Sequence, residues 1–274
     1  MTDHSLKDLR VAITGGTSGL GRGLVLELLD RGARVAFVAR HRDEVERTML
    51  DCPAAHGIVG DVSQKEDIHP IAIQIVGALD GLDVLVNNAS SLGPVPLRPL
   101  ADTACEDLEL ALATNLVGPF RLTKALLGAL AASARDGGRP AVVNISSDAA
   151  VTPYENWGAY GASKAALQHL SRIWDSELAV EGIRVVAVDP GDMDTPLHAL
   201  AVPDADRSAL KRPETAAREI ADLIAGLRSR NGTPEGVPYE AVPEGVPCEA
   251  VPEEVPCDRT TPFEERLSIA ELAR

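Results

Sequence analysis

The feature that most constrains the fold is a series of short apolar runs separated by segments of helix length. Six runs of strand length occupy residues 9–14, 34–39, 57–59, 84–87, 141–145 and 184–188. Most are rich in valine, isoleucine and alanine without polar alternation, which is typical of parallel strands buried on both faces. The segments between them are long enough for crossover helices. This repeated β-α pattern predicts an α/β fold with a doubly wound parallel sheet.

The helices predicted between these runs cover residues 19–31, 64–79, 105–134, 159–181 and 213–228. The last of them opens on Pro213, a residue tolerated in the first helical turn because the amide there has no intrahelical acceptor. We therefore expect one large domain over residues 1–230. Its 45% hydrophobic content suffices for a well-buried core.

The composition changes abruptly beyond residue 230. A nine-residue repeat rich in proline, glutamate and valine runs through residues 234–242, 243–251 and, shortened, 252–257. Regular proline removes amide donors and restricts φ, so this tract is neither a helix nor a central strand. We expect residues 231–260 to form an extended, largely disordered or loosely docked tail, in which residues 237–242 could add an edge strand. Residues 261–274 are expected to form a short amphipathic helix.

Charge and cysteine content exclude several classes of function. The formal net charge of −15 argues against nucleic-acid binding, which depends on concentrated positive charge. No apolar stretch reaches the roughly 18 to 20 residues of a membrane span, so we expect a soluble, cytoplasmic protein. The four cysteines have neither CxxC spacing nor nearby histidine clusters. They indicate reduced thiols and no metal site.

A glycine-rich segment follows the first predicted strand and carries the strongest local signal. It reads Thr14-Gly15-Gly16-Thr17-Ser18-Gly19-Leu20-Gly21. Glycines allow a tight turn and let backbone amides approach a pyrophosphate, which the N-terminus of the next helix favours electrostatically. The spacing differs from G-x-G-x-x-G, and a glycine-rich turn can be no more than a turn.

At this segment the chain resembles the short-chain dehydrogenase/reductase family, whose members carry T-G-x-x-x-G-x-G at the same place. Further matches follow in family order over most of the chain: Asp61-Val62, Asn87-Asn88-Ala89, Asn115, Ser147, Tyr160-x-x-x-Lys164 and Pro190-Gly191 with Thr195. The resemblance implies a Rossmann-type sheet and hydride transfer between nicotinamide and a carbonyl or secondary alcohol. The cofactor-binding residues it implies are Thr14, Gly15, Thr17, Ser18, Gly19, Leu20, Gly21, Asp61, Val62, Asn88, Ala89, Tyr160, Lys164, Pro190, Gly191 and Thr195.

Tyr160 and Lys164 are the predicted catalytic pair. Four residues apart on a helix, they share one face, so the ammonium can lie close to the phenol. A positive charge within about 4–6 Å favours the phenolate, so we expect a lowered Tyr160 pKa and proton transfer near neutral pH. By the resemblance Lys164 also holds the nicotinamide ribose. The alternative is a solvent-facing helical pair.

Ser147 and Asn115 complete the predicted catalytic set. Ser147 follows a parallel strand, where its hydroxyl can bind the substrate oxygen. Ser146 competes for this role, and similar enzymes use the second serine of the pair. Asn115 lies within a long apolar helix, and in the family the matching asparagine holds a water that relays protons to the lysine. A purely structural hydrogen bond is the alternative for Asn115.

The residues at the end of the second predicted strand indicate whether the cofactor carries a 2′-phosphate. NAD enzymes of this type usually place an acidic residue near Ala39, and here Arg40 and Arg42 follow instead. Guanidinium groups suit a 2′-phosphate, so NADP(H) is favoured, with NAD(H) possible. The alternative is that Arg40 is an ordinary solvated arginine. Ser90 replaces the glycine common in Asn-Asn-Ala-Gly, which slightly tightens that turn.

The substrate is the least determined part. Residues 192–203 are expected to form a mobile lid, with Tyr154 and Trp157 in the pocket and His198 more readily at the surface. Small to medium aliphatic carbonyls or alcohols fit the low aromatic content. The helices that contain Asn115 and Tyr160 are expected to pair in a homodimer or homotetramer. A non-catalytic NADP(H) sensor is the main alternative function, followed by an epimerase or dehydratase.

Overall fold

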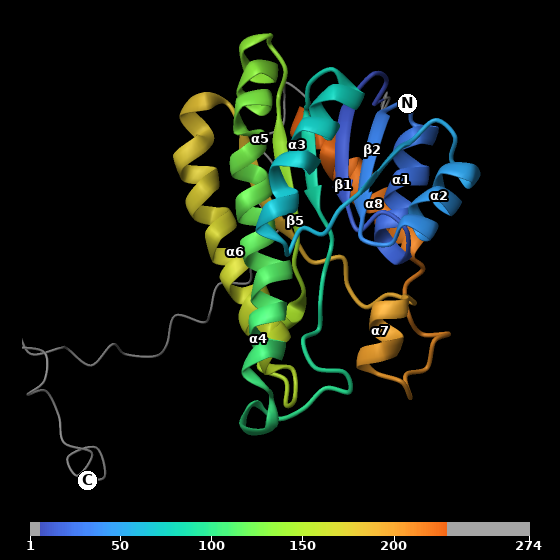
Figure 1. Ribbon diagram of the computed structural model, residues 1–274, viewed down its shortest axis with the longest axis vertical. Helices are drawn as coiled ribbons and strands as arrows, with labels where there is room; N and C mark the ends of the chain where they lie inside the picture. The colour runs from blue at the N-terminus through green and yellow to red at the C-terminus, as the bar shows by residue number, and fades with distance from the viewer. Residues whose placement is uncertain (1–5, 229–274) are drawn as a thin grey trace, which may run out of the picture. The chain divides into compact units, whose positions relative to one another are not determined.

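A computed structural model describes residues 6–228 and places six strands in one parallel sheet (Figure 1). The strands are β1 (Arg10–Thr14), β2 (Arg34–Ala39), β3 (His56–Val59), β4 (Val84–Asn87), β5 (Ala141–Ile145) and β6 (Arg184–Val188). Their order is β3-β2-β1-β4-β5-β6. After β3 the chain crosses back to the other side of β1, so the switch point of the sheet lies between β1 and β4. Because all strands are parallel, their carboxyl ends share one edge, where this fold binds ligands.

Helices cover both faces of the sheet. The helices are α1 (Gly19–Asp30), α2 (Arg42–Asp51), α3 (Lys65–Leu79), α4 (Cys105–Leu112), α5 (Gly118–Arg135), α6 (Gly158–Leu178), α7 (Pro196–Ala201) and α8 (Pro213–Arg228). The apolar residues of α1, α2 and α8 pack on one face, while those of α3, α5 and α6 pack on the other. Valine, isoleucine and alanine on both sides of each strand fill these two cores, as expected for a sheet without a solvent face.

The predicted Rossmann-type doubly wound sheet is confirmed, and the strands match their predicted bounds to within one residue. Two short helices were not predicted. α2 buries only Val45 and Thr48 among charged residues, and α7 is six residues long within the predicted lid segment. The predicted repeat tail and C-terminal helix lie outside the described residues.

The predicted helix over residues 105–134 is interrupted. A π-helical turn, Ala113–Val117, separates α4 from α5 and contains Asn115. A π turn inserts one extra residue per turn and commonly marks a functional site. Likewise the predicted helix over residues 159–181 ends as an α-helix at Leu178, and its last turn, Ala179–Glu181, is a 3₁₀ helix.

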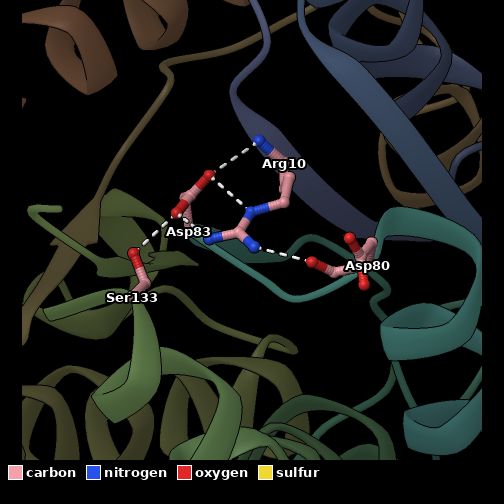
Figure 2. Close-up of polar contacts among 4 residues, drawn as sticks. All are labelled: Arg10, Asp80, Asp83 and Ser133. Carbon is pink, nitrogen blue, oxygen red and sulfur yellow. Dashed lines mark hydrogen bonds and ion pairs between the residues drawn. The ribbon is translucent and has the colours of Figure 1, made fainter. Parts of the chain in front are cut away.

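A partly buried ion pair joins the amino ends of β1 and β4 (Figure 2). Asp83, just before β4, accepts hydrogen bonds from Arg10 Nε and Nη2 at 3.0 and 2.8 Å and from the Ser133 hydroxyl at 2.6 Å. Arg10 also donates to the Asp80 carbonyl. Burial alone raises the pKa of Asp83, but the hydrogen bonds from Arg10 and Ser133 outweigh it and lower that pKa to about 2. This network therefore links β1, β4 and α5 at the edge opposite the cleft.

The outer surface of α5 and α6 carries apolar side chains. Phe120 is 37% exposed and stacks on Trp174 with ring centroids 5.2 Å apart, and Ile173 beside it is 43% exposed. The predicted pairing of these helices with a second copy stays a prediction. Among the residues that the structure describes, no helix has both the length and the apolar character to cross a bilayer.

We predict that Asp83→Asn lowers the free energy of unfolding by about 2 kcal/mol at pH 7, because the amide cannot accept the same charge-assisted bonds. The folded-state pKa lies below the unfolded value near 3.9, so this stability is present above about pH 4 and is lost as the pH falls toward 2. Urea unfolding at several pH values measures it.

The matched control is Asp51→Asn, which removes an exposed pair with Arg22. Exposed pairs contribute roughly 0–1 kcal/mol, so this variant is expected to unfold close to the wild type. Equal losses in both variants, or a difference for Asp83→Asn that does not shrink in acid, would contradict the assignment.

Candidate active site

A cleft of about 720 Å³ opens at the carboxyl edge of the sheet. It is lined by residues that follow β1, β2, β3, β4, β5 and β6, together with the first turns of α1 and most of α7. Every predicted site residue lines it except Thr14 and Asn115, which lie behind its wall. Residues that are distant in sequence therefore meet here because parallel strands end at one edge.

Two glycines of the turn between β1 and α1, Gly15 and Gly21, are required for different reasons. Gly15 has φ of +70°, a left-handed conformation that favours glycine, and its amide donates to the Val38 carbonyl at 2.7 Å. Gly21 has an ordinary φ, but a Cβ there would collide with the Gly15 carbonyl oxygen and the Asn88 side chain. The turn is thus too tight for any other side chain at either place.

Asn88 and Thr14 fix this turn from beneath. The Asn88 side-chain amide donates to the carbonyls of Thr14 and Gly15 at 2.9 and 3.1 Å. In return the Thr14 hydroxyl oxygen accepts from the amides of Asn88 and Ala89, both at 3.0 Å. Thr14 thus joins β1 to the end of β4, and its predicted role in binding the cofactor stays a prediction.

The N-terminus of α1 faces the cleft with free backbone donors. Its N-cap, Ser18, has an extended backbone and makes no side-chain capping bond. Gly19 and Thr195 approach each other so closely that a Cβ on Gly19 would lie 3.2 Å from the Thr195 methyl carbon. A helix N-terminus attracts anions through its unpaired amides and dipole, so the observed arrangement fits a phosphate-bearing ligand.

One end of the cleft, past β2, is lined by Arg40, His41 and Glu44. Glu44 accepts a hydrogen bond from the Thr17 hydroxyl at 3.1 Å. Arg42, the second arginine considered, pairs with Glu46 at 3.9 Å and does not line the cleft. Arg40 is therefore the guanidinium at this end.

Asp61 and Val62 lie on the same wall after β3. The Asp61 carboxylate accepts hydrogen bonds from the amide and the hydroxyl of Ser63, at 2.9 and 2.8 Å. Val62 is 6% exposed and packs into the core beside α3. These contacts hold the backbone of this segment at the cleft surface.

Tyr160 and Lys164 lie on one face of α6, as predicted, and both are buried, at 7% and 2% exposure. Lys164 Nζ donates to the Ile145 carbonyl, at the end of β5, at 2.7 Å and lies 5.5 Å from the centroid of the Tyr160 ring. An ammonium has three hydrogens, and this is the one hydrogen bond that the described residues give it. The alternative of a solvent-facing pair is wrong.

The predicted lowering of the Tyr160 pKa is wrong for the protein alone. Burial of the phenol raises its pKa to about 12, although hydrogen bonds with Ser147 and Ser90 oppose the change, and the charges of Asp189 and Asp148 raise it further. The Lys164 ammonium lies over the ring and is itself disfavoured by burial, which lowers its pKa to about 8. Desolvation therefore outweighs the attraction that spacing alone suggested.

Ser147 is the serine whose hydroxyl meets Tyr160. It caps the turn Asp148–Ala150, where its oxygen accepts from the Ala149 amide at 3.2 Å. Its hydroxyl donates to Asp148 Oδ1 at 3.0 Å. The Ser146 hydroxyl is buried and has no hydrogen-bond partner among the described residues. This contrast favours Ser147 over Ser146.

The amide nitrogen and the amide oxygen of the Asn115 side chain each make two hydrogen bonds to other residues of the protein. Its Nδ2 donates to the Ser91 carbonyl at 2.7 Å and to the Ser163 hydroxyl at 2.8 Å. Its Oδ1 accepts from the Ser91 amide at 2.8 Å and the Ser90 hydroxyl at 3.2 Å. Asn115 therefore makes the structural hydrogen bonds that were the alternative to a catalytic role. Its predicted role in a water relay stays a prediction.

Comparisons with known proteins agree with this geometry. Residues 10–206 match the family described as short chain dehydrogenase. The chain belongs to the short-chain dehydrogenase family. Glucose 1-dehydrogenase of Gluconobacter oxydans is 30% identical over 236 residues, which cover 82% of this chain and 86% of that protein. L-xylulose reductase of Bos taurus is 29% identical over 206 residues, with 75% and 80% coverage.

Solved structures of other proteins show the same arrangement. A 3-ketoacyl-(acyl-carrier-protein) reductase from Brucella melitensis, complexed with NADH, has a TM-score of 0.74 at 26% identity and covers 82% of this chain and 93% of its own. Actinorhodin polyketide ketoreductase with NADPH has a TM-score of 0.70 at 29% identity, covering 79% and 90%. This short-chain dehydrogenase is thus an oxidoreductase of the dehydrogenase and reductase class.

The opposite end of the dehydrogenase cleft, around Tyr160, contains residues that the sequence analysis only partly found. Tyr154 and Trp157 line it, as predicted, and so does His198, for which a surface position was preferred. The segment 192–203 also lines the cleft, and its mobility stays a prediction. Asp148 was missed, although a charged residue directly after Ser147 was a visible signal.

We predict that Gly21→Ala destabilises this dehydrogenase by about 2 kcal/mol, because the added methyl group forces apart the turn that holds Gly15. Gly226→Ala is the control, since a Cβ on this exposed glycine of α8 meets nothing within 4 Å. A helical glycine-to-alanine change in open space stabilises by up to about 1 kcal/mol. Thermal unfolding of both variants compares them, and equal melting temperatures would be inconsistent with the tight turn.

Proposed function

We propose that this chain transfers a hydride between a nicotinamide cofactor and a carbonyl or secondary alcohol carbon, with Tyr160 as general acid and base. The observation that carries the proposal is the placement of Tyr160, Lys164 and Ser147 together on the floor of one cleft. The cleft also meets the needs of a dinucleotide: a glycine turn that admits no side chain, and a helix N-terminus with unpaired amides.

Several backbone amides and side chains would hold the cofactor. The amides near Gly19 would bind the pyrophosphate, while Asp61, Val62 and Ala89 lie where the adenosine would rest. The Lys164 ammonium donates one hydrogen to the Ile145 carbonyl, so its other hydrogens would bond the hydroxyls of a ribose. When bound, the nicotinamide ring supplies or accepts the hydride.

The protein's own part is to place the substrate oxygen and move its proton. Ser147 lies within hydrogen-bonding reach of Tyr160, so one substrate oxygen can contact both hydroxyls. With a pKa of about 12, Tyr160 is protonated at neutral pH and ready to donate to a carbonyl oxygen. The reverse reaction needs the phenolate, which added positive charge in the cleft would favour.

We predict that Tyr160→Phe lowers kcat of carbonyl reduction by at least about a hundredfold, because the proton donor is lost. Binding of NADPH, followed by its fluorescence, is expected to change little, since the ring still fills its buried position. Ser146→Ala is the matched control, because the Ser146 hydroxyl has no partner among the described residues, and it is expected to retain activity.

Two results would argue against this function. Turnover of a carbonyl panel that survives in Tyr160→Phe would exclude the tyrosine as the acid. Binding of NADPH with no turnover of any carbonyl or alcohol would favour the non-catalytic sensor.

We also propose that NADP(H) is the preferred cofactor, as supported by Arg40 at the end of the cleft past β2. A guanidinium favours a 2′-phosphate through charge-assisted hydrogen bonds. Glu44 lies in the same region, but its carboxylate already accepts from Thr17.

We predict that Arg40→Ala weakens NADPH binding by about tenfold to a hundredfold and changes NADH binding little. Arg42→Ala is the matched control, because Arg42 lies outside the cleft and pairs with Glu46. Fluorescence titration with both cofactors measures the ratio. An unchanged preference in Arg40→Ala, or stronger binding of NADH than of NADPH by the wild type, would contradict the assignment.

A further inference from the structure

The Asp148 carboxylate lies directly beside the reacting hydroxyls. Its Oδ1 accepts from Ser147 at 3.0 Å, and its Oδ2 accepts from the Tyr154 hydroxyl at 2.6 Å. A substrate oxygen bonded to Ser147 would lie roughly 2.8 Å from Oγ and therefore within about 6 Å of this carboxylate. Any charge that the substrate carries near its reacting carbon is thus within ion-pairing range of Asp148.

Most other charges at this end of the cleft are negative as well, and the exception is the buried Lys164 ammonium. Asp189 and Asp192 also line it, and none of the ion pairs identified among residues 6–228 includes Asp148, Asp189 or Asp192. Arg40 and His41 follow β2, which is three strands from β5 and hence roughly 14 Å away across the sheet.

The remaining side chains here suit a cation as well. The rings of Tyr154 and Trp157 lie 6.3 Å apart, and Trp157 meets Tyr160 edge-on at 5.7 Å. Aromatic faces attract ammonium groups, most strongly where solvent is partly excluded. His198 of α7 also lines the cleft, and the buried Lys164 ammonium, 5.5 Å from the Tyr160 ring centroid, has one acceptor among the described residues.

We propose that the substrate carries a cationic nitrogen, a protonated or quaternary amine, within a few atoms of the reacting carbon, and that Asp148 is the residue that selects it. The inference rests on the proposed function and adds the substrate class to it. Substrates with a carboxylate at the same place are disfavoured, because they would meet the Asp148 carboxylate, whereas the Lys164 ammonium is buried and donates to the Ile145 carbonyl.

The same charge relation bears on catalysis. The Tyr160 pKa is raised by burial and, to a smaller degree, by the charges of Asp189 and Asp148. A substrate cation close to these carboxylates opposes that effect. It therefore stabilises a developing phenolate when the proton leaves Tyr160.

The test compares three methyl ketones of similar size with NADPH: trimethylammonioacetone, its uncharged carbon analogue methyl neopentyl ketone, and levulinate. We expect kcat/KM to be at least about tenfold higher for the ammonium ketone than for the neutral one, and lowest for levulinate. Binding of trimethylammonioacetone to the protein saturated with NADP⁺ is measured by calorimetry, so that affinity is read without turnover.

Three variants separate charge from positioning. Asp148→Asn keeps a side chain of the same shape and is expected to lose about tenfold in affinity for the ammonium ketone, and to lower the ratio of kcat/KM for the ammonium ketone to that for the neutral ketone about tenfold. Asp192→Asn removes a charge without touching Ser147 and is expected to lose about threefold. Asp30→Asn, at the far end of α1, is the control for net charge and is expected to match the wild type.

The outcomes distinguish the two proposals. Equal kcat/KM for the charged and neutral ketones, or unchanged ammonium affinity in Asp148→Asn, overturns this inference and leaves the hydride-transfer function standing. If no ketone is turned over but the ammonium ketone binds and Asp148→Asn weakens it, the cation site is supported and the proposed function fails. Equal losses in Asp148→Asn and Asp30→Asn would also overturn the inference.

Discussion

The structure depends on one constraint: a parallel sheet whose two faces are both buried. Because every strand runs the same way, the chain must return over a face after each strand, and all six carboxyl ends come to one edge. Residues as distant in sequence as Gly19 and Thr195 therefore meet. At the opposite edge the strands are joined instead by the paired charges of Arg10 and Asp83, with Ser133 bonded to the same carboxylate.

Within the cleft, the pKa values of Tyr160 and Lys164 are set more by burial than by the attraction between the two groups. Lys164 and Tyr160 are both removed from water, and each is driven toward its neutral form. The protein alone thus holds a protonated phenol above an easily neutralised ammonium. Such a site is poised to change its protonation when charged ligands enter, so the ligands take part in setting its acidity.

The parts of this fold that could be predicted are those whose cause is local. Strands such as β5 are apolar on both faces, and that composition is visible in the sequence. α2 was missed because it buries only Val45 and Thr48 and so lacks an apolar stripe. The π turn at Asn115 depends on Ser91 and Ser163, which no spacing relates to it. The direction of the Tyr160 pKa shift was wrong because the sequence does not show that the phenol is buried, and burial is the largest cause of the rise in its pKa.

The contact between Asn88 and the glycine-rich turn affects how tightly a ligand binds. The turn is already held in shape by hydrogen bonds to the Thr14 and Gly15 carbonyls. This turn does not have to become ordered when a dinucleotide binds, so little conformational entropy is lost there. Preorganisation of this kind leaves most of the contact energy available as affinity, and a side chain outside the glycine motif provides it.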